Sequence, residues 1–201
     1  VDGIYGLIGS LSLNTFTAIA VLFLLSGNNG YLTYPLILAT ATLPYLIFNL
    51  GYFKSYSKKI FMGDAGSMLV GFTIIWLLCI GTQSSTPAFA PVTALWIVAV
   101  PLIDMAAIMI RRVRKGESPF KPDREHLHHI FMRAGASSKQ TLLIICTISL
   151  LLTFFGIYLE QVSETVSFIM FIITFLVYNY LLSHIWKAIT FMKKFKSEVF
   201  K

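Results

Sequence analysis

The sequence predicts an all-α protein, a polytopic membrane helix bundle with about six transmembrane helices. Of its 201 residues, 56% are hydrophobic and only 12% are charged, and its mean hydropathy of +0.75 exceeds that of an ordinary soluble domain. The apolar runs are continuous and do not alternate with polar residues, which favours helices over the strands of a transmembrane barrel. We therefore expect residues 1–201 to form a single transmembrane domain.

Six apolar runs approach the length of about 20 residues that a helix needs to cross a hydrocarbon core. Each run is therefore predicted to be one helical span. In order along the chain, they comprise residues 6–25, 31–50, 66–81, 92–110, 141–159 and 166–185.

The positions of the basic residues predict how these spans are oriented. All 16 Lys and Arg residues lie in three segments, residues 54–59, 111–139 and 187–201, which follow the second, fourth and sixth runs. By the positive-inside rule these segments face the cytoplasm, and both termini do so too. The net charge of +7 is explained by this rule and by contact with anionic membrane lipid, so we expect no nucleic-acid partner.

Two acidic residues, Asp2 and Asp64, precede spans whose N-terminal ends point towards the cytoplasm. The N-terminus of a helix favours a bound anion, and a carboxylate is the hard oxygen ligand that Mg²⁺ prefers. Gly63 and Gly66 would let the backbone approach a ligand closely, and Ser67 could add a hydroxyl donor. Alternatively, Asp64 is a plain helix N-cap that needs no ligand.

A third acid, Asp104, falls within the fourth predicted span. An ionisable group inside a span is a candidate functional residue. Asp104 is also close enough in sequence to Arg111 and Arg112 to form a structural ion pair with them. The sequence leaves both interpretations open.

The connection of residues 111–138 is too long to lack structure in a compact bundle, so we expect a long cytoplasmic loop that carries a short helix. Asp123 is predicted to cap this helix, which would run over residues 124–134 and end at Gly135.

Histidines and an arginine give the predicted helix its chemistry. His126, His129 and Arg133 have the spacing of one helical face, and His128 lies off that face. Two imidazoles and a guanidinium suit a phosphate or diphosphate. Two alternatives stay open: a solvated basic loop, and a zinc site, although a closed zinc site usually needs four ligands.

Four motifs together are similar to those of a known family. VDGIYGL stands at the start of the chain, IFMGDAGS precedes the third span, PLIDM lies in the fourth, and SPFKPDREHLHH lies in the long loop. In this combination and order they resemble the C-terminal half of the polyprenyl-phosphate N-acetylhexosamine-1-phosphate transferase family (glycosyltransferase family 4).

The resemblance implies a reaction at the cytoplasmic face of the bacterial inner membrane. N-Acetylglucosamine-1-phosphate would pass from UDP-N-acetylglucosamine to undecaprenyl phosphate, with Mg²⁺ or Mn²⁺ as cofactor. This is the first step of O-antigen or enterobacterial common antigen synthesis, and so of lipopolysaccharide biosynthesis.

The resemblance also implies roles for individual residues. Asp64 would be the metal ligand, and Asp2 matches the first acid of a family motif. His126, His128 and His129 would contact the phosphates of the nucleotide sugar and, with the two acids, form the catalytic set. The expected substrate-binding residues are Gly63, Gly66, Ser67, Arg124 and Arg133.

The chain departs from the family pattern in two ways. Tyr5 stands where the family motif has a second acid, and a family aspartate pair would lie upstream of Val1. We therefore expect a separate or missing N-terminal half to be a partner, and a second copy of the chain could be another. The alternative function is that of an inactive remnant or a non-catalytic scaffold that binds nucleotide sugar or lipid.

Overall fold

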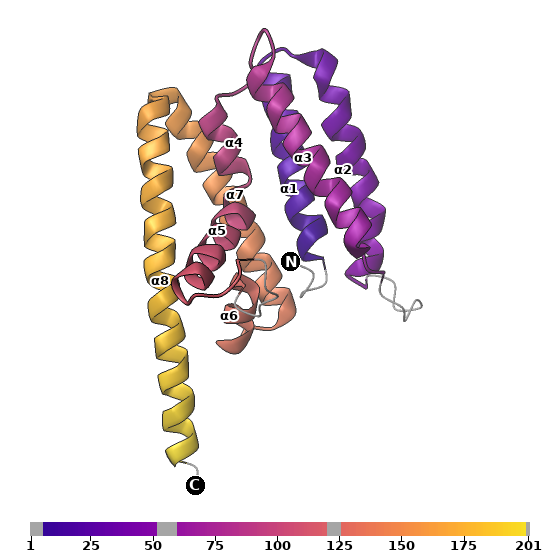
Figure 1. Ribbon diagram of the computed structural model, residues 1–201. Helices are drawn as coiled ribbons and strands as arrows, with labels where there is room; N and C mark the ends of the chain where they lie inside the picture. The colour runs from indigo at the N-terminus through magenta and orange to yellow at the C-terminus, as the bar shows by residue number, and fades with distance from the viewer. Residues whose placement is uncertain (1–5, 52–59, 120–125, 200–201) are drawn as a thin grey trace.

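The computed structural model describes residues 6–51, 60–119 and 126–199, and in these ranges the only regular elements are α-helices (Figure 1). The helices are α1 (Leu7–Leu25), α2 (Asn29–Asn49), α3 (Gly63–Gln83), α4 (Pro91–Ile97), α5 (Ala99–Arg114), α6 (Leu127–Arg133), α7 (Ser138–Val162) and α8 (Glu164–Val199).

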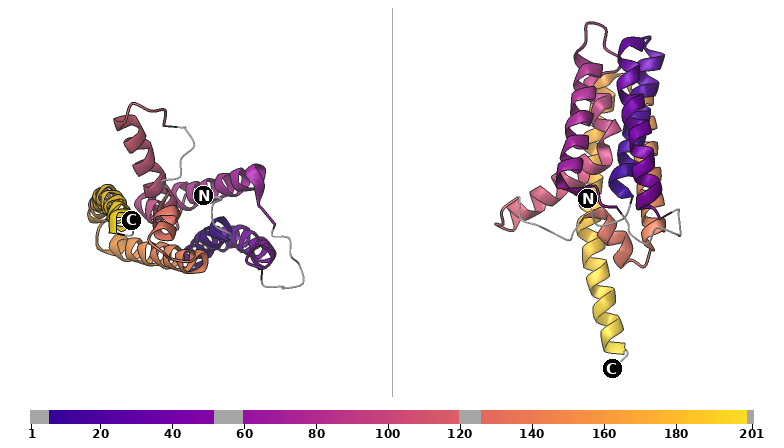
Figure 2. Two further views of the ribbon diagram at one scale, coloured as in Figure 1. Left: turned by 90° about the horizontal axis from the view of Figure 1, so that it is seen from below. Right: turned by 90° about the vertical axis from the view of Figure 1, so that its right-hand side faces the viewer.

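The predicted membrane helix bundle is confirmed. Five helices are long and apolar enough to cross a bilayer: α1, α2, α3, α7 and the first part of α8, from Glu164 to Leu182. The bent pair of α4 and α5 brings the total to six if it counts as one span. The long helices run up and down beside one another, as Figures 1 and 2 show.

Residues 92–110, predicted to be one helical span, form two helices instead of one. The chain bends by 82° between α4 and α5. Pro101, in the first turn of α5, has no N–H with which to continue the helical hydrogen bonds of α4, so a break here costs little. Seven residues give α4 a length of only about 10 Å, and α5 leaves the bundle sideways (Figure 2). The predicted loop also begins later than residue 111, because α5 continues to Arg114.

Trp96 of α4 organises the packing of α4 against α7 and α8. Its ring makes edge-on contacts with Phe155 and Phe171, at centroid distances of 5.4 and 5.2 Å. The buried indole N–H donates a hydrogen bond to the Ser167 hydroxyl (3.0 Å). Gly156 allows this approach, because a Cβ atom there would lie 2.2 Å from Trp96. The α4 helix is therefore fixed in place although it is short.

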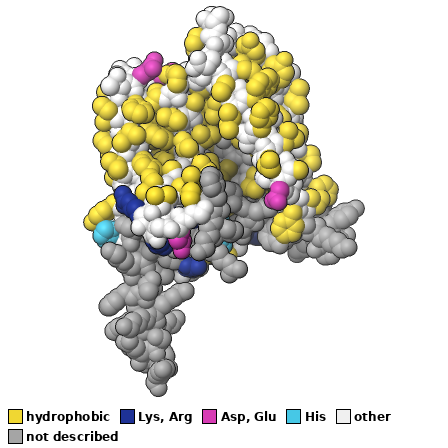
Figure 3. All heavy atoms as spheres, in the orientation of Figure 1, with side chains coloured by type: hydrophobic (Ala, Val, Ile, Leu, Met, Phe, Trp, Pro, Cys, Tyr) yellow, Lys and Arg dark blue, Asp and Glu magenta, His cyan; other side chains and the backbone are white. Residues whose placement is uncertain are grey.

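Apolar side chains cover much of the outer surface of the bundle (Figure 3). Large exposed hydrophobic residues occur on α2, α3, α7 and α8; examples are Ile37, Phe72, Phe154 and Leu176. An exposed apolar surface of this extent is unusual in a water-soluble monomer and is expected where lipid surrounds a protein.

One end of the bundle, here called the basic end, lies at the bottom of Figure 1. There α1 and α3 begin, α2 ends, and α6 lies between α5 and α7. The 36 residues of α8 would extend over about 54 Å, and its C-terminal part projects beyond the bundle at this end (Figure 1). The connections without Lys or Arg lie at the opposite end.

Candidate functional site

The short helix of the long loop, α6, is present but begins later than predicted. It starts at Leu127, with His126 in extended backbone at its N-cap position. The predicted cap Asp123 and the predicted substrate-binding residue Arg124 lie outside the described residues. The predicted end is confirmed: Gly135 has a positive φ of 104°, and its N–H donates to the carbonyl of Met132.

The later start of α6 changes how the histidines are arranged. His126 precedes the helix, so the predicted common helical face of His126, His129 and Arg133 is wrong. Instead the three histidine rings lie together: His128 is stacked on His126 (5.7 Å between centroids) and contacts His129 (4.1 Å). Arg133 is exposed at the far end of α6.

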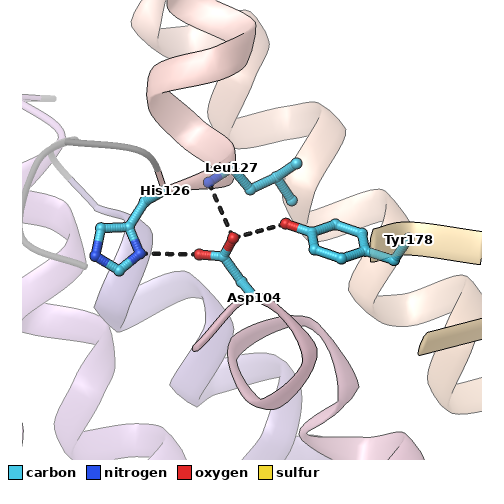
Figure 4. A network of polar contacts seen from close by, with 4 residues as sticks. All are labelled: Asp104, His126, Leu127 and Tyr178. Atoms are coloured by element: carbon cyan, nitrogen blue, oxygen red, sulfur yellow. Dashed lines mark hydrogen bonds and ion pairs between the residues drawn. The ribbon is translucent and has the colours of Figure 1, made fainter. Parts of the chain in front are cut away.

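Asp104 of α5 binds the start of α6 (Figure 4). Its Oδ2 lies 3.0 Å from His126 Nδ1, and its Oδ1 accepts hydrogen bonds from the backbone N–H of Leu127 (3.1 Å) and the hydroxyl of Tyr178 (2.6 Å). The carboxylate is only 13% exposed. The sequence left two interpretations of Asp104 open. The partners of its carboxylate are His126, Leu127 and Tyr178, so Asp104 does not form the alternative ion pair with Arg111 or Arg112.

A cavity of about 270 Å³ opens beside this network. Asp104, His126 and His128 form its polar edge, and the rest of its wall is apolar. The apolar residues come from α1, α5, α6 and α7: Leu7, Leu11, Val100, Pro101, Met105, Leu127 and Ile145. The cavity thus combines titratable groups with a surface suited to hydrocarbon.

His128 is the most buried of the three histidines, with 4% of its surface exposed. Burial and the neighbouring His129 ring lower the pKa of His128 from 6.5 to about 4, so its ring is neutral at pH 7. Its Nε2 atom is buried and has no hydrogen-bond partner in the described part of the protein. A neutral ring at the edge of a cavity can exchange a hydrogen bond with a ligand but adds no positive charge to attract a phosphate.

The second predicted group of residues lies at the start of α3. Asp64 is the second residue of that helix rather than its N-cap, and its carboxylate is exposed and unpaired among the described residues. Ser67 donates its hydroxyl to the backbone carbonyl of Asp64 (2.9 Å). Gly63 has a φ of 70°, a conformation that favours glycine, and a Cβ atom on Gly66 would lie 2.7 Å from Met62.

The structure places these two groups at the same end of the bundle without joining them. Asp64 does not line the cavity that holds Asp104, His126 and His128. The predicted catalytic residue Asp2 and the variant motif position Tyr5 lie outside the described residues.

The described residues suit a loosely held divalent cation better than a protein-built cage. They contain no group of three or more His, Cys, Asp or Glu side chains that could hold a metal. Asp64 offers one exposed carboxylate, and Mg²⁺ is commonly bound by one or two carboxylates while phosphate oxygens and water complete its shell. The donor chemistry therefore fits a cation that arrives with a phosphate ligand.

Tyr178 was not among the residues predicted for the site. The available signal was a phenol within an apolar run, because a buried Tyr hydroxyl normally needs a partner. The sequence could not identify that partner, since Asp104 lies 74 positions away.

Comparison with known proteins matches the first part of the chain, which includes the start of α3, to a family model. Residues 1–82 match the model of glycosyl transferase family 4. The resemblance predicted from the motifs is confirmed.

Relatives of this family align with almost the whole chain. Undecaprenyl-phosphate alpha-N-acetylglucosaminyl 1-phosphate transferase of Escherichia coli (strain K12) is 46% identical over 98% of the chain, and that of Salmonella typhi is 45% identical over the same share. The enzyme of the same name from Haemophilus influenzae is 46% identical over 94%. The chain spans 54% of the length of each of these relatives. No solved structure matches the chain.

Proposed function

We propose that this chain is the C-terminal part of a phosphoglycosyl transferase that moves N-acetylglucosamine-1-phosphate from UDP-N-acetylglucosamine to undecaprenyl phosphate. The carrying observation is the identity of 44–46% to transferases of that name along nearly the whole chain. The basic end would face the cytoplasm of a bacterial inner membrane, where the nucleotide sugar is available. In that setting the product would start O-antigen or enterobacterial common antigen synthesis.

The geometry of the cavity supports a lipid phosphate as acceptor. Its polar edge of Asp104, His126 and His128 meets apolar walls from four helices. A second, almost entirely apolar cavity of about 340 Å³ lies between α5, α6, α7 and α8 and shares Val100 and Leu127 with the first. A ligand with a charged head and a hydrocarbon tail matches this arrangement, because each part would meet a surface of its own kind.

The chain's own residues would act at the phosphates. His126 would exchange a proton or a hydrogen bond with a phosphate oxygen at Nε2, and His129 would contact the phosphates as well. His128, neutral at pH 7, would orient the ligand without adding charge. Asp64, assisted by the close backbone at Gly63 and Gly66, would hold Mg²⁺ or Mn²⁺. The cation supplies screening of the phosphate charges when it is bound.

If the family's aspartate pair, expected in the N-terminal half, is essential, the proposed reaction needs that half as well as this chain. The direct test uses bacterial membranes containing the chain, with and without the N-terminal part of the Escherichia coli relative. Membranes supplied with radiolabelled UDP-N-acetylglucosamine, undecaprenyl phosphate and Mg²⁺ should form labelled lipid when both parts are present. Absence of labelled lipid in both cases, while the intact relative is active, would favour the inactive remnant or non-catalytic scaffold.

The metal role of Asp64 has a matched control. Asp64→Asn should reduce exchange of UMP into UDP-N-acetylglucosamine by at least about 100-fold, because one neutral amide replaces the only carboxylate of the α3 start. Glu164→Gln changes an exposed acid in the first turn of α8, at the opposite end, and should leave exchange unchanged. UMP exchange that is as fast in Asp64→Asn as in Glu164→Gln would show that Asp64 does not hold the metal.

A further inference from the structure

We propose that Asp104 is a positioning residue that fixes the tautomer and orientation of His126, so that Nε2 is the one nitrogen of this ring that exchanges a proton with a bound phosphate. The proposal rests on the proposed function for its phosphate ligand. Its structural part, the tautomer, is independent of whether the chain catalyses anything.

The hydrogen-bond chemistry of the pair dictates the tautomer. An ionised carboxylate only accepts hydrogen bonds, so the contact of 3.0 Å between Asp104 Oδ2 and His126 Nδ1 requires the proton to be on Nδ1. The neutral ring then carries a lone pair on Nε2. Because the Nδ1 proton is held by the carboxylate in both the neutral and the charged ring, proton exchange is confined to Nε2.

The other two contacts hold the carboxylate itself in place. Oδ1 accepts from the N–H of Leu127, which is an otherwise unpaired donor at the start of α6, and from the hydroxyl of Tyr178 on α8. Asp104 therefore has fixed partners on two helices in addition to His126. A ring bound to such an anchored group loses most of its rotational freedom before a ligand arrives.

The position of His126 gives this arrangement a use. Its ring is 26% exposed and lines the cavity of about 270 Å³, whereas His128 behind it is buried. Of the two, only His126 has both a carboxylate partner on one nitrogen and access to the cavity. The pattern is that of a histidine oriented by an acid for proton transfer at its other nitrogen.

Replacement of Asp104 by asparagine changes the contact with His126 but keeps the hydrogen bonds that hold residue 104 to α6 and α8. The amide oxygen can still accept from Leu127 and Tyr178, but the amide NH₂ would face His126 Nδ1 and donate to it. The proton of the neutral ring would then move to Nε2. An Asp→Asn change that inverts a histidine tautomer in this way lowers kcat by about 10⁴-fold in serine proteases while the geometry stays intact.

The deciding experiment is ¹⁵N NMR of the histidine rings in the full chain, reconstituted in lipid bilayers at a pH where His126 is neutral. The chain has four histidines, and loss of one signal set in His126→Gln assigns the ring. We expect the Nδ1–H tautomer in the unchanged chain, the Nε2–H tautomer in Asp104→Asn, and no inversion in Tyr178→Phe. An Nε2–H tautomer in the unchanged chain overturns the proposal without any variant, and so does an uninverted ring in a folded Asp104→Asn protein.

Kinetics with the N-terminal half present give the second readout. Asp104→Asn should lower kcat by about 100-fold or more and change KM for UDP-N-acetylglucosamine by less than about threefold, because proton transfer and not substrate binding is lost. Glu160→Gln, an acid with comparable contacts at the opposite end, should leave both constants unchanged. An inverted tautomer with unchanged kcat would overturn the role in the reaction. Inactivity of the unchanged chain would count against the proposed function alone, since the NMR result stands separately.

Discussion

Two carboxylates at opposite ends of the bundle make similar contacts in different surroundings. Glu160 of α7 accepts hydrogen bonds from the backbone N–H of Ala90 (2.8 Å), at the N-cap of α4, and from the hydroxyl of Thr93. Asp104 accepts from the backbone N–H that begins α6 and from the hydroxyl of Tyr178. Each acid thus stabilises the start of a helix of seven residues, where unpaired N–H groups and the helix dipole favour a negative charge.

The difference between the two acids is the third contact. Asp104 also binds the ring of His126, which lines a cavity. Beside it, His128 is buried and its Nε2 has no hydrogen-bond partner among the described residues. At the opposite end the polar groups around α4 are paired, as the bond from Trp96 to Ser167 shows. A carboxylate that caps a helix is therefore no evidence of function by itself. The distinguishing features are a titratable partner with access to a cavity and an unsatisfied polar atom nearby.

The largest expected effect on stability concerns the end of the bundle that holds α4, opposite to the histidines, and tests whether α4 is packed rigidly there. Gly156→Ala places a Cβ atom 2.2 Å from Trp96 and should lower the free energy of unfolding by about 3 kcal/mol, because a buried indole must move. Gly71→Ala is the control, since a Cβ atom on Gly71 of α3 meets nothing within 4 Å. Thermal unfolding followed by tryptophan fluorescence should show a much lower Tm for the first variant only. Similar Tm values would mean that the contact of α4 with α7 is loose.

The second prediction concerns pH and the basic end. The pKa of His128 is lowered from 6.5 to about 4 in the folded protein, so the unfolded chain binds more protons between these values. The contribution of His128 to the free energy of unfolding is therefore fully present above pH 6.5 and is lost as the pH falls towards 4. Between pH 7 and 5 the loss is about 2 kcal/mol, from 1.5 pH units at 1.36 kcal/mol each.

His128→Phe provides the comparison for that measurement, because phenylalanine does not titrate. Unfolding in detergent across this pH range should depend less steeply on pH in the variant than in the unchanged chain. Equal pH dependence in both would contradict a neutral, buried His128.

The smallest expected effect on stability concerns Glu160 and tests whether this acid, unlike Asp104, has only a structural role. Glu160→Gln replaces two charge-assisted hydrogen bonds by neutral ones and should cost about 1 kcal/mol of stability. Binding of UDP to the chain, measured by calorimetry, should not change, because α4 and its cap lie at the end opposite to the histidines. Weakened UDP binding would show that the two ends are coupled, and the distinction between them would fail.

The sequence was sufficient to predict most of the fold. Long apolar runs fix the spans within a few residues, as residues 141–159 illustrate beside the observed helix Ser138–Val162. The bend at Val98 was missed because residues 92–110 are as apolar as a straight span, although Pro101 carried a signal for a break. Hydropathy measures transfer into lipid and is insensitive to the direction of the helix axis.

The candidate site was predictable in its residue types but not in its contacts. The histidines and Asp104 stood out in the sequence, whereas the partnership of Asp104 with His126 and Tyr178 joins positions 22 and 74 residues apart. The burial of His128 comes from the packing of α6 against the bundle, which the spacing of residues along α6 does not show. Tertiary packing, which local spacing does not encode, decided both.

The bond from Tyr178 to Asp104 has a consequence for the order in which the protein is made. The chain leaves the ribosome from its N-terminus, so α5 and α6 are synthesised before α8. The carboxylate that holds His126 receives one of its partners only when α8 has entered the membrane and packed beside α5. The histidine segment therefore matures only after α8 has been made. A polypeptide that stops before Tyr178 would insert most of its helices and still leave this site unfinished.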